Sequence, residues 1–239
     1  MKYKVYDIHS HVVPAIDDGA SNLDMAIEIL RLAYAQGTRG IVCTSHSGYN
    51  TERYKKNLKM LQERVKKENI EINLYPGCEI DGSSYLSQEI VEKLNANKFL
   101  TINGTKYVLV EFSPFAPANI IVYSIQQIIE SGYNVILAHA ERHLGLSNQY
   151  DSVAKLKKLG CLLQVNAYSL YEERNVAIKL LAMSLLKDKH VDFIGSDVHR
   201  TDHRTYTIEN GINYIYENCD EEYAKDICYR NAEKLLNIR

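Results

Sequence analysis

The chain contains no tryptophan, few phenylalanines and no excess of charge of either sign. Its 28 lysine and arginine residues against 30 aspartate and glutamate residues leave a formal net charge of -2. This balance gives no electrostatic case for a nucleic acid or an anionic membrane as partner. The N-terminus has no apolar signal region, and no apolar stretch approaches membrane-spanning length. We therefore expect a soluble, cytoplasmic protein that neither binds nucleic acid nor inserts into a membrane.

Three nucleophile or phosphate motifs are also missing. A cysteine-based tyrosine phosphatase needs Cys-x5-Arg, so that a phosphate-binding loop holds the thiolate beneath the phosphorus, but no cysteine here is followed by arginine at that spacing. There is no Gly-x-Ser-x-Gly elbow and no Walker-type Gly-Lys-Ser/Thr. The cysteines are odd in number and not closely paired, which favours a reduced setting over a disulfide framework. They are Cys43, Cys78, Cys161, Cys219 and Cys228.

Short apolar runs alternate with helical patterns along the whole chain. The runs are rich in valine and isoleucine and nearly continuous in apolar character, as strands covered on both faces should be. Strands are expected at Lys4–Ile8, Gly40–Thr44, Ile70–Tyr75, Tyr107–Phe112, Val135–Ala138, Cys161–Asn166 and Phe193–Ser196.

The first helix has the clearest boundaries. Ser21 with Asp24 forms a capping-box pattern, and Gly37 is the expected stop. Further helices are expected over Ile120–Ser131, Asp151–Leu159 and Asn175–Asp188, and near 208–217, 220–229 and 231–237.

Seven strand–helix units without a linker predict one domain over residues 1–239, a closed or nearly closed (β/α)7 barrel. An open doubly wound sheet is the weaker alternative, because it gathers ligands at a switch point and not from nearly every strand.

Most of the potential metal ligands fall just past the end of a predicted strand. Five of the 8 histidines keep this phase, as do three acids, and the carboxyl ends of parallel strands converge on one mouth. The pattern therefore predicts a polynuclear metal centre. Its candidates are His9, His11, His46, Glu79, Glu111, His139, Asp197 and His199.

The acids among these candidates have an alternative explanation. Glu79, Glu111 and Asp197 could each be salt-bridged to a buried arginine or lysine, since an unpaired carboxylate after an apolar run is very costly. Metal coordination removes that cost equally well, and the repeated phase favours it. His-x-His at 9 and 11 places two imidazoles on one side of the chain, where they can share a cation with Glu79 and Asp197.

Residues outside this pattern are more ambiguous. In Asp17-Asp18-Gly19 a tight turn competes almost evenly with a third cation site, completed by one Asp with His46 and His199. Arg142 and Arg204 fit as phosphate-binding forks, with ordinary surface arginines as the alternative. His143, His190 and His203 lie off the pattern or at loop edges, and we expect His190 at the surface.

The ligand types indicate the chemistry. Imidazoles with several carboxylates, and no clustered cysteines, suit Mn²⁺, Fe or Zn²⁺ in a hydrolytic site. Closely spaced cations that share a carboxylate, for which Glu79 is the natural candidate, acidify a bridging water and hold a phosphate in line.

With these segments assembled, the chain resembles the polymerase-and-histidinol-phosphatase (PHP) superfamily. Within it, the chain is most similar to the bacterial tyrosine-protein phosphatases of the CpsB/YwqE type. The resemblance spans nearly the whole chain. It rests on Asp-Ile-His-Ser-His at 7–11, Asp-Asp-Gly at 17–19, Gly-x-Arg-x-Ile-Val at 37–42, Pro-Gly-x-Glu-Ile at 76–80, Val-Glu-Phe at 110–112, Ala-His-x-Glu-Arg at 138–142, Gly-Ser-Asp-x-His at 195–199 and Asn-Ala-Glu-x-Leu-Leu at 231–236.

This resemblance implies a distorted (β/α)7 TIM-like barrel of the PHP type with three cations, usually Mn²⁺. It also implies a substrate, the phosphotyrosine tail of a membrane-associated tyrosine kinase that controls capsular or exopolysaccharide synthesis. The implied ligand sets are His9, His11, Glu79 and Asp197 for the first metal, Glu79, Glu111 and His139 for the second, and Asp18, His46 and His199 for the third. Arg142 and Arg204 would bind the phosphate. In a hydrolytic mechanism, His199 or a metal-bound water could supply a proton to the leaving group.

The chain departs from the family pattern at two positions. Asp81 stands where relatives often carry arginine, and Ala140 replaces a usual proline. Two other functions remain open at this point: a small-molecule phosphatase of the histidinol-phosphate kind, and a metal-stabilised scaffold that binds the kinase without hydrolysis.

Overall fold

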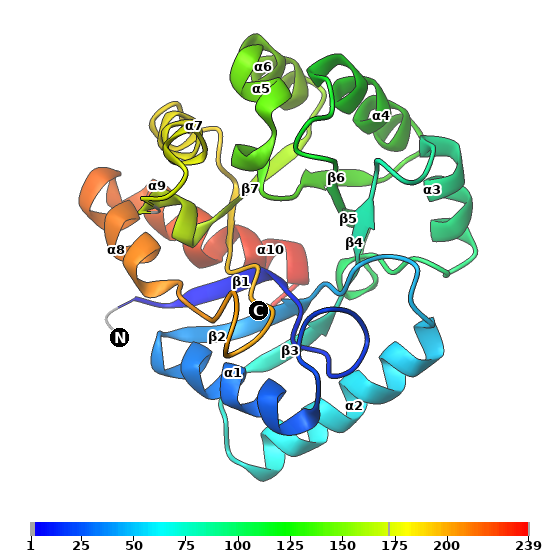
Figure 1. The fold of residues 1–239 in the computed structure, drawn as a ribbon, viewed down its shortest axis with the longest axis vertical. Helices are drawn as coiled ribbons and strands as arrows, with labels where there is room; N and C mark the ends of the chain where they lie inside the picture. Colours follow the sequence, from blue (N-terminus) through cyan, green and yellow to red (C-terminus); the bar gives the residue numbers. More distant parts are fainter. Residues whose placement is uncertain (1–2, 172, 239) are drawn as a thin grey trace.

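The computed structural model describes residues 3–171 and 173–238, which form an α/β fold with parallel strands at its centre and helices around them (Figure 1). The strands are β1 (Val5–Ser10), β2 (Thr38–Cys43), β3 (Asn73–Pro76), β4 (Glu79–Asp81), β5 (Tyr107–Glu111), β6 (Asn134–Leu137), β7 (Leu162–Asn166) and β8 (Phe193–Gly195).

The strands form two sheets that are joined into a ring. One sheet has the order β1-β2-β3 and the other β4-β5-β6-β7-β8. Isolated parallel bridges connect them, Ser10 with Val198 at one junction and His46 with Glu79 at the other. Because β3 and β4 are consecutive pieces of one segment, the ring has seven strand positions. The predicted (β/α)7 barrel, distorted where the sheet breaks, is confirmed.

The helices lie outside the strands (Figure 1). Among the residues described, no helix combines the length and the apolar character that crossing a bilayer requires. The α-helices are α1 (Leu23–Ala35), α2 (Thr51–Lys67), α3 (Ser87–Asn95), α4 (Ala118–Glu130), α5 (Leu144–Asn148), α6 (Asp151–Lys158), α7 (Val176–Lys187), α8 (Glu209–Asn218), α9 (Glu221–Lys225) and α10 (Asn231–Leu236). Short 3-10 turns occur at Ile102–Gly104, Ala140–Arg142 and Ala167–Leu170, and a π turn at Asp226–Arg230 joins α9 to α10.

The predicted stop of the first helix is confirmed and its predicted cap is wrong. Gly37 has φ +87, a conformation that glycine adopts without steric cost. The N-cap of α1 is Asn22, whose side chain accepts a hydrogen bond of 2.9 Å from the backbone N–H of Met25. Ser21 lies one residue outside the helix, so the capping box with Asp24 does not form.

Three candidate ligands lie within strands, and one of them, Glu111, was already inside the predicted strand Tyr107–Phe112. His9 belongs to β1, Glu79 opens β4 and Glu111 ends β5. β1 extends further than predicted because Ser10 pairs with Cys43 on one side and with Val198 on the other. The strand ends are therefore themselves part of the candidate site.

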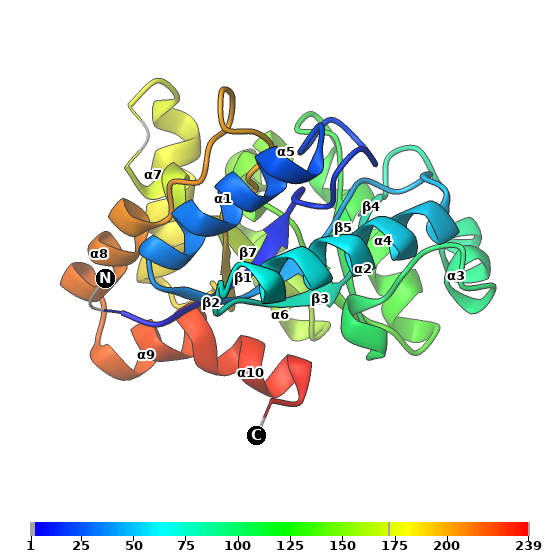
Figure 2. The same ribbon diagram turned by 90° about the horizontal axis from the view of Figure 1, so that it is seen from below.

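An apolar core fills one end of the barrel. Side chains of the strands, such as Ile8, Leu109 and Ile136, pack there against Leu235 and Leu236 of α10. Figure 2 shows α9 and α10 at the opposite end of the molecule from the loop that follows β1. Because apolar side chains occupy the α10 end, the polar candidates gather at the other end.

Candidate metal centre

Glu79 lies at the middle of the site and is almost completely buried. Its Oε1 atom is 3.1 Å from Nε2 of both His9 and His139. Its Oε2 atom is 3.1 Å from Nδ1 of His46 and 3.3 Å from Nε2 of His11. One carboxylate is therefore surrounded by four imidazoles from three separate segments of the chain.

Two further carboxylates border this cluster. Asp197 places Oδ1 at 3.5 Å from Nε2 of His9 and 3.6 Å from Nε2 of His11. Glu111 places Oε1 at 3.2 Å from Nδ1 of His46 and Oε2 at 3.5 Å from Nε2 of His139. The structure thus brings together the acids that the sequence placed at three different strands.

The Asp-Asp-Gly loop contributes one side chain to the turn and one to the site. Asp17 accepts a hydrogen bond from the backbone N–H of Gly19 (3.1 Å), which is the turn role, and a second one from the backbone N–H of His46 (2.9 Å), which links the loop to the segment after β2. Asp18 places Oδ1 at 3.5 Å from Nε2 of His46 and 3.4 Å from Nε2 of His199. Asp17 therefore has the turn role, and Asp18 stays a candidate ligand of a third cation.

All nine candidate ligands meet at one mouth, and three groups have donor atoms close enough to share an ion. These groups are His11, Asp18, His46 and His199; His9, His11 and Glu79; and His46, Glu79 and Glu111. They overlap the sets implied by the family resemblance without matching them atom for atom. In the third group His46 stands nearer to Glu111 than His139 does.

Hydrogen bonds orient three of the imidazoles. Nδ1 of His9 lies 2.9 Å from Gln164 Oε1, Nδ1 of His11 lies 2.9 Å from Asp17 Oδ2, and Nδ1 of His199 lies 3.0 Å from the carbonyl oxygen of Asp197. Each of these oxygens accepts, so each Nδ1 carries the hydrogen and Nε2 is left facing the cluster. Metal-ligating histidines are oriented in this way in proteins.

The donor set fits divalent cations. Neutral Nε2 atoms and carboxylate oxygens that face one another at 3.1 to 3.6 Å repel unless a proton or a cation lies between them. Burial lowers the pKa of His139, but hydrogen bonds to Glu111 and Glu79 outweigh burial and raise this pKa to about 10. Burial raises the pKa of Glu111, but bonds to His139 and His46 bring it down to about 2. A divalent cation can displace the protons that these imidazoles otherwise hold.

The backbone is strained at the site. His139 has φ 31, Asp197 has φ 53 and Arg204 has φ 51, all in the left-handed region that side chains with a Cβ rarely adopt. Residues held in such conformations cluster at functional sites, where the surrounding structure maintains them. The two candidate ligands among them lie two residues after the ends of β6 and β8.

Both predicted phosphate-binding arginines reach the mouth. Arg142 donates from Nη1 to Asp197 Oδ2 at 3.2 Å, and Arg204 pairs with the same oxygen. Nη1 of Arg204 also lies 2.9 Å from Nε2 of His199. The two guanidinium groups line a cavity of about 860 Å³ together with Tyr168. Neither side chain is an ordinary surface arginine.

The other histidines lie outside the cluster. His143 is buried behind it, and burial lowers its pKa to about 3. His203 is exposed and lines the cavity beside Arg204. His190 is partly exposed next to Tyr150, which agrees with the expected position at the surface.

Four supporting residues escaped the sequence analysis. They are Gln164, Asn166, Glu141, and Asp17 in its contact with His11. Glu141 is buried and accepts hydrogen bonds from the Asn166 backbone N–H (3.1 Å) and the Ser169 hydroxyl (2.7 Å). A signal for two of them exists, because Gln164 and Asn166 are polar residues at alternate positions of an otherwise apolar run.

The two departures from the family pattern have plain structural roles. Asp81 accepts hydrogen bonds from the backbone N–H groups of Ser83 (2.8 Å) and Ser84 (3.1 Å) and so stabilises the turn after β4. Ala140 is buried between His139 and Arg142, in the 3-10 turn that carries the arginine.

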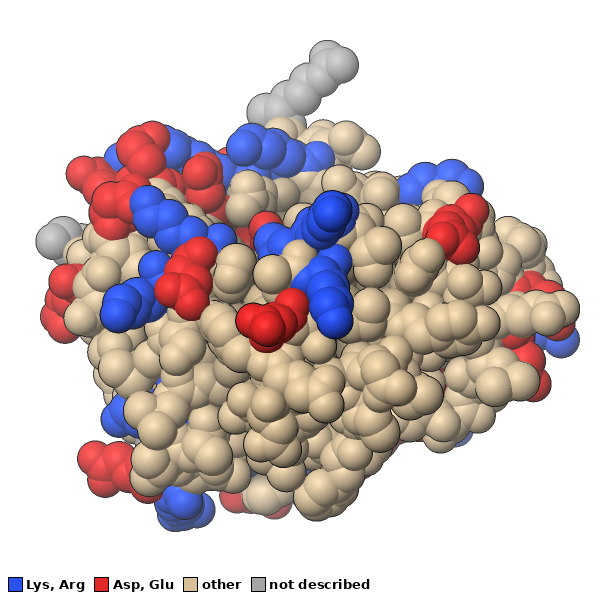
Figure 3. Space-filling model, turned by 90° about the horizontal axis from the view of Figure 1, so that it is seen from above, with Lys and Arg blue, Asp and Glu red and all other residues tan. Residues whose placement is uncertain are grey.

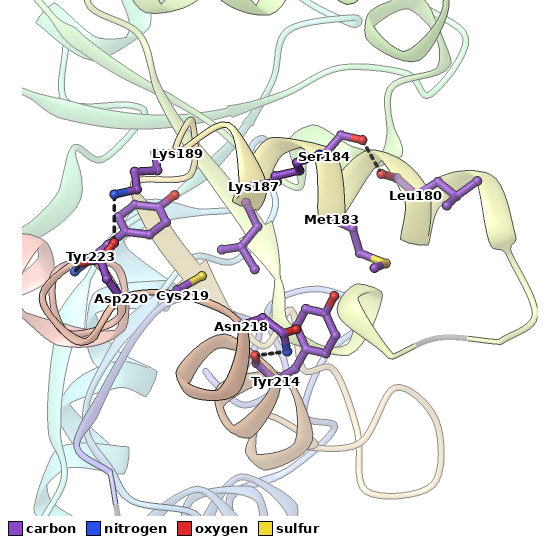
Figure 4. A pocket seen from close by; sticks show the side chains of 11 residues that line it. Leu180, Met183, Ser184, Lys187, Lys189, Tyr214, Asn218, Cys219, Asp220 and Tyr223 are labelled. Carbon is purple, nitrogen blue, oxygen red and sulfur yellow. Dashed lines mark hydrogen bonds and ion pairs between the residues drawn. The ribbon is translucent and has the colours of Figure 1, made fainter.

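A second cavity lies on the outer side of the barrel between α7 and α8 (Figure 4). It measures about 460 Å³, and Met183, Tyr214 and Cys219 are among its lining side chains. Within residues 3–171 and 173–238, none of the nine candidate ligands contributes to this lining. Basic and acidic side chains lie side by side on the face shown in Figure 3, in keeping with the net charge of -2.

Fold and site together define a parallel α/β barrel with a buried cluster of imidazoles and carboxylates at its mouth. The chain belongs to the CpsB/CapC family of capsular polysaccharide synthesis, whose family model matches residues 5–237. It is 31% identical to the tyrosine-protein phosphatase YwqE of Bacillus subtilis, over 96% of this chain and 91% of YwqE. It is 28% identical to the tyrosine-protein phosphatase CpsB of Streptococcus agalactiae, over 96% of this chain and 97% of CpsB.

Solved structures agree with this assignment. A structure from the crystallographic study of YwqE from Bacillus subtilis and CpsB from Streptococcus pneumoniae, described as unique metal-dependent tyrosine phosphatases, superposes with a TM-score of 0.87 at 27% identity. The superposition covers 97% of this chain and 94% of that one. Histidinol phosphate phosphatase from Lactococcus lactis shares the fold, with a TM-score of 0.61, 14% identity and coverage of 90% and 93%.

Proposed function

We propose that this protein is a metal-dependent protein-tyrosine phosphatase. The observation that carries the proposal is Glu79, a buried carboxylate with imidazole nitrogens at 3.1 to 3.3 Å on both of its oxygens. The names of the relatives, tyrosine-protein phosphatases CpsB and YwqE, support the reaction type. One domain over residues 1–239 would carry the whole site.

The proposed ligands are the nine residues of the mouth, and we propose three cations, Mn²⁺ before Fe or Zn²⁺. When bound, such cations act as Lewis acids on phosphoryl oxygens and lower the pKa of bound water. They are held by His9, His11, Asp18, His46, Glu79, Glu111, His139, Asp197 and His199.

Arg142 and Arg204 bind the phosphoryl oxygens in this proposal. Each guanidinium group has five N–H donors, so contact with Asp197 leaves donors for a phosphate. Their fixed fork geometry suits two oxygens of one phosphoryl group, and their charge offsets the charge that develops during transfer.

The leaving group needs little help from an acid. A tyrosine phenol has a pKa of about 10, well below that of an alkyl alcohol. Burial, with His11 and Arg204 nearby, lowers the pKa of His199 to about 4, so His199 is neutral near pH 7. We propose His199 first as a ligand, and its role as a proton donor stays a prediction from the sequence.

The proposed substrate is the phosphotyrosine tail of a membrane-associated bacterial tyrosine kinase, met on the cytoplasmic side. Membership of a capsular polysaccharide synthesis family supports a role in capsule or exopolysaccharide production. The chain would then act on the kinase and not on the polysaccharide.

The test compares Mn²⁺-dependent phosphate release from a phosphotyrosine tail peptide and from histidinol phosphate. We expect a kcat/KM at least about tenfold higher for the peptide, since the wide cavity beside Arg142 and Arg204 leaves room for a phenol ring and flanking chain. A preference for histidinol phosphate would identify a small-molecule phosphatase. Binding of the peptide without phosphate release would identify a scaffold.

A further inference from the structure

A chain of three hydrogen bonds links two of the proposed ligands through the side chains of β7. His9 Nδ1 lies 2.9 Å from Gln164 Oε1, Gln164 Nε2 donates to Asn166 Oδ1 at 2.8 Å, and Asn166 Nδ2 donates to Asp197 Oδ2 at 3.0 Å. His9, Gln164 and Asn166 are fully buried and Asp197 is 2% exposed. Water therefore does not compete for these bonds.

The direction of this chain follows from its two ends. The backbone N–H of His139 can only donate, and it donates to Gln164 Oε1 at 2.8 Å. At the other end the carboxylate of Asp197 can only accept. The oxygen of Gln164 must then face His9 and His139, and the amide groups of Gln164 and Asn166 each have a single orientation that satisfies every link.

This direction determines which atoms of the two ligands face the cluster. His9 must carry its hydrogen on Nδ1, so Nε2 keeps its lone pair at 3.1 Å from Glu79 Oε1. Asp197 has Oδ2 engaged by Asn166 and both arginines, so Oδ1 is the oxygen turned toward His9 and His11.

The local backbone holds these hydrogen-bonded side chains in place. Residues 162, 164 and 166 share one face of β7, and Leu163 and Val165 face the outer core. On the neighbouring strand β8, Gly195 leaves room for the contact. A Cβ added there would lie 2.7 Å from both Gln164 Nε2 and His9 Cβ. Any side chain at 195 would push His9 and Gln164 apart.

We propose that Gln164 and Asn166 are positioning residues of the metal centre. Gln164 selects the tautomer of His9, and Asn166 selects the ligating oxygen of Asp197. This inference rests on the proposed metal site, and it adds two uncharged residues that never touch the cation. Partners of this kind typically contribute 10–100-fold to metal affinity.

The test is calorimetric titration of the metal-free full chain with Mn²⁺, for Gln164→Leu and Asn166→Ala. For Gln164→Leu we expect affinity about 10–100-fold weaker, because His9 loses the acceptor for its Nδ1–H. For Asn166→Ala we expect a smaller loss, because Arg142 and Arg204 still hold Asp197 Oδ2. The double variant is expected to lose less than the two single effects combined, because the links act in series.

The control separates positioning from general stability. Gln36 also makes three hydrogen bonds, to Tyr206, Ile208 and Glu209, none of which involves a proposed ligand. Gln36→Leu should lower the Tm of the metal-free protein and leave Mn²⁺ affinity unchanged.

Three outcomes would overturn the inference: unchanged affinity in Gln164→Leu, an equal affinity loss in Gln36→Leu, or strictly additive losses in the double variant. Should Gln164→Leu fail to fold, the test rests on Asn166→Ala. Unchanged Mn²⁺ affinity in that variant would overturn the positioning role of the hydrogen-bond chain. A wild-type protein that binds no Mn²⁺ would instead refute the proposed function, so the two failures are distinguishable.

Discussion

Among single residues, Glu79 holds four histidines of the cluster together. Its two oxygens contact imidazoles from β1, from the loop after β1, from the loop after β2 and from His139, two residues after β6. No other acid of the cluster touches four histidines, as far as the described residues show. Substitution of this one side chain therefore tests the whole assembly.

We predict that Glu79→Gln loses bound Mn²⁺ and activity together. The amide offers one acceptor oxygen where two are used, and its NH₂ group, which cannot bind a cation, replaces the second oxygen, so kcat should fall at least about 100-fold. Metal content after gel filtration and hydrolysis of p-nitrophenyl phosphate measure both effects. Glu130→Gln, an exposed residue of α4, is the control. Full turnover in Glu79→Gln would contradict the assignment.

We predict that Arg142→Ala, unlike Glu79→Gln, keeps its metal and loses activity. Removing one cationic donor from a developing phosphoryl charge costs about 10²–10³ in kcat/KM. Steady-state kinetics with a phosphotyrosine peptide and metal analysis of the same sample check this. Arg200→Ala, which removes only an exposed pair with Asp202, is the matched control. Loss of metal in Arg142→Ala would assign the arginine to the structure of the site.

The sequence predicted the ligands that assemble at the mouth better than it predicted the residues that orient these ligands. Histidines and acids at strand ends are visible because such residues rarely follow apolar runs without a reason. Gln164 and Asp17 are common residue types, and their importance depends on the atom each faces across the barrel. That information belongs to the packing of distant strands and not to local spacing.

At the scale of elements, the loop between β1 and α1 folds back tightly on the residue that precedes it. The backbone N–H of Ala20 donates to the His11 carbonyl oxygen at 3.1 Å. A Cβ added at Gly19 would lie 2.1 Å from that oxygen and 2.6 Å from His11 Cβ. The glycine of Asp-Asp-Gly is therefore needed for close approach, and this loop brings both aspartates to the site.

We predict that Gly19→Ala weakens Mn²⁺ binding and lowers the stability of the metal-free protein by about 1–3 kcal/mol, the usual cost of overpacking. The loop must move away from His11, which separates Asp17 from its imidazole. Titration with Mn²⁺ and urea denaturation measure the two effects. Ser21→Ala in the same loop is the control, since its side chain is exposed. Unchanged Mn²⁺ affinity in Gly19→Ala would show that the loop does not shape the site.

The elements themselves were largely predictable. The predicted strands overlap seven of the observed ones, because buried parallel strands have a continuous apolar signature. β4 was not predicted as a strand, because it has three residues and begins with a charged one. The cap of α1 was misplaced by one residue because Ser21 and Asn22 are both good capping residues. Which of the two residues caps α1 depends on the path of the backbone before the helix.

At the scale of the whole molecule, the cluster makes the stability of the folded protein depend on pH and on bound metal. Burial lowers the pKa values of His11 and His46, but pairing with the surrounding carboxylates outweighs burial and raises them from 6.5 to about 9 and about 11. A raised pKa means that the folded state binds the proton more tightly than the unfolded state. The resulting stability is fully present below pH 6.5 and is lost as the pH rises through these folded values.

We therefore predict that the Tm of the EDTA-treated protein falls more steeply between about pH 6.5 and about pH 9 than the Tm of the Mn²⁺-loaded protein. In the loaded protein the imidazoles have already given up their protons, so this contribution is absent. Calorimetric scans with and without metal across this range give the comparison. Parallel declines of the two Tm curves would contradict the prediction.

The sequence predicted that the strands form a closed ring, but not where the ring closes. Alternating units indicate a ring of parallel strands, but the two junctions depend on single bridges at Ser10 and Glu79. Neither bridge has a local signature, because each forms between segments far apart in the chain.

The junction at Ser10 has a consequence for synthesis on the ribosome. β1 needs the segment after β8 as its second neighbour, and 197 − 9 = 188 positions separate Asp197 from His9. At about 5–20 residues per second, the nascent chain carries its first two imidazoles for roughly 10–40 s before the last ligands emerge. Translation must pass the eighth strand before the ion-binding pocket can assemble, so loading with metal is one of the final events in the maturation of this enzyme.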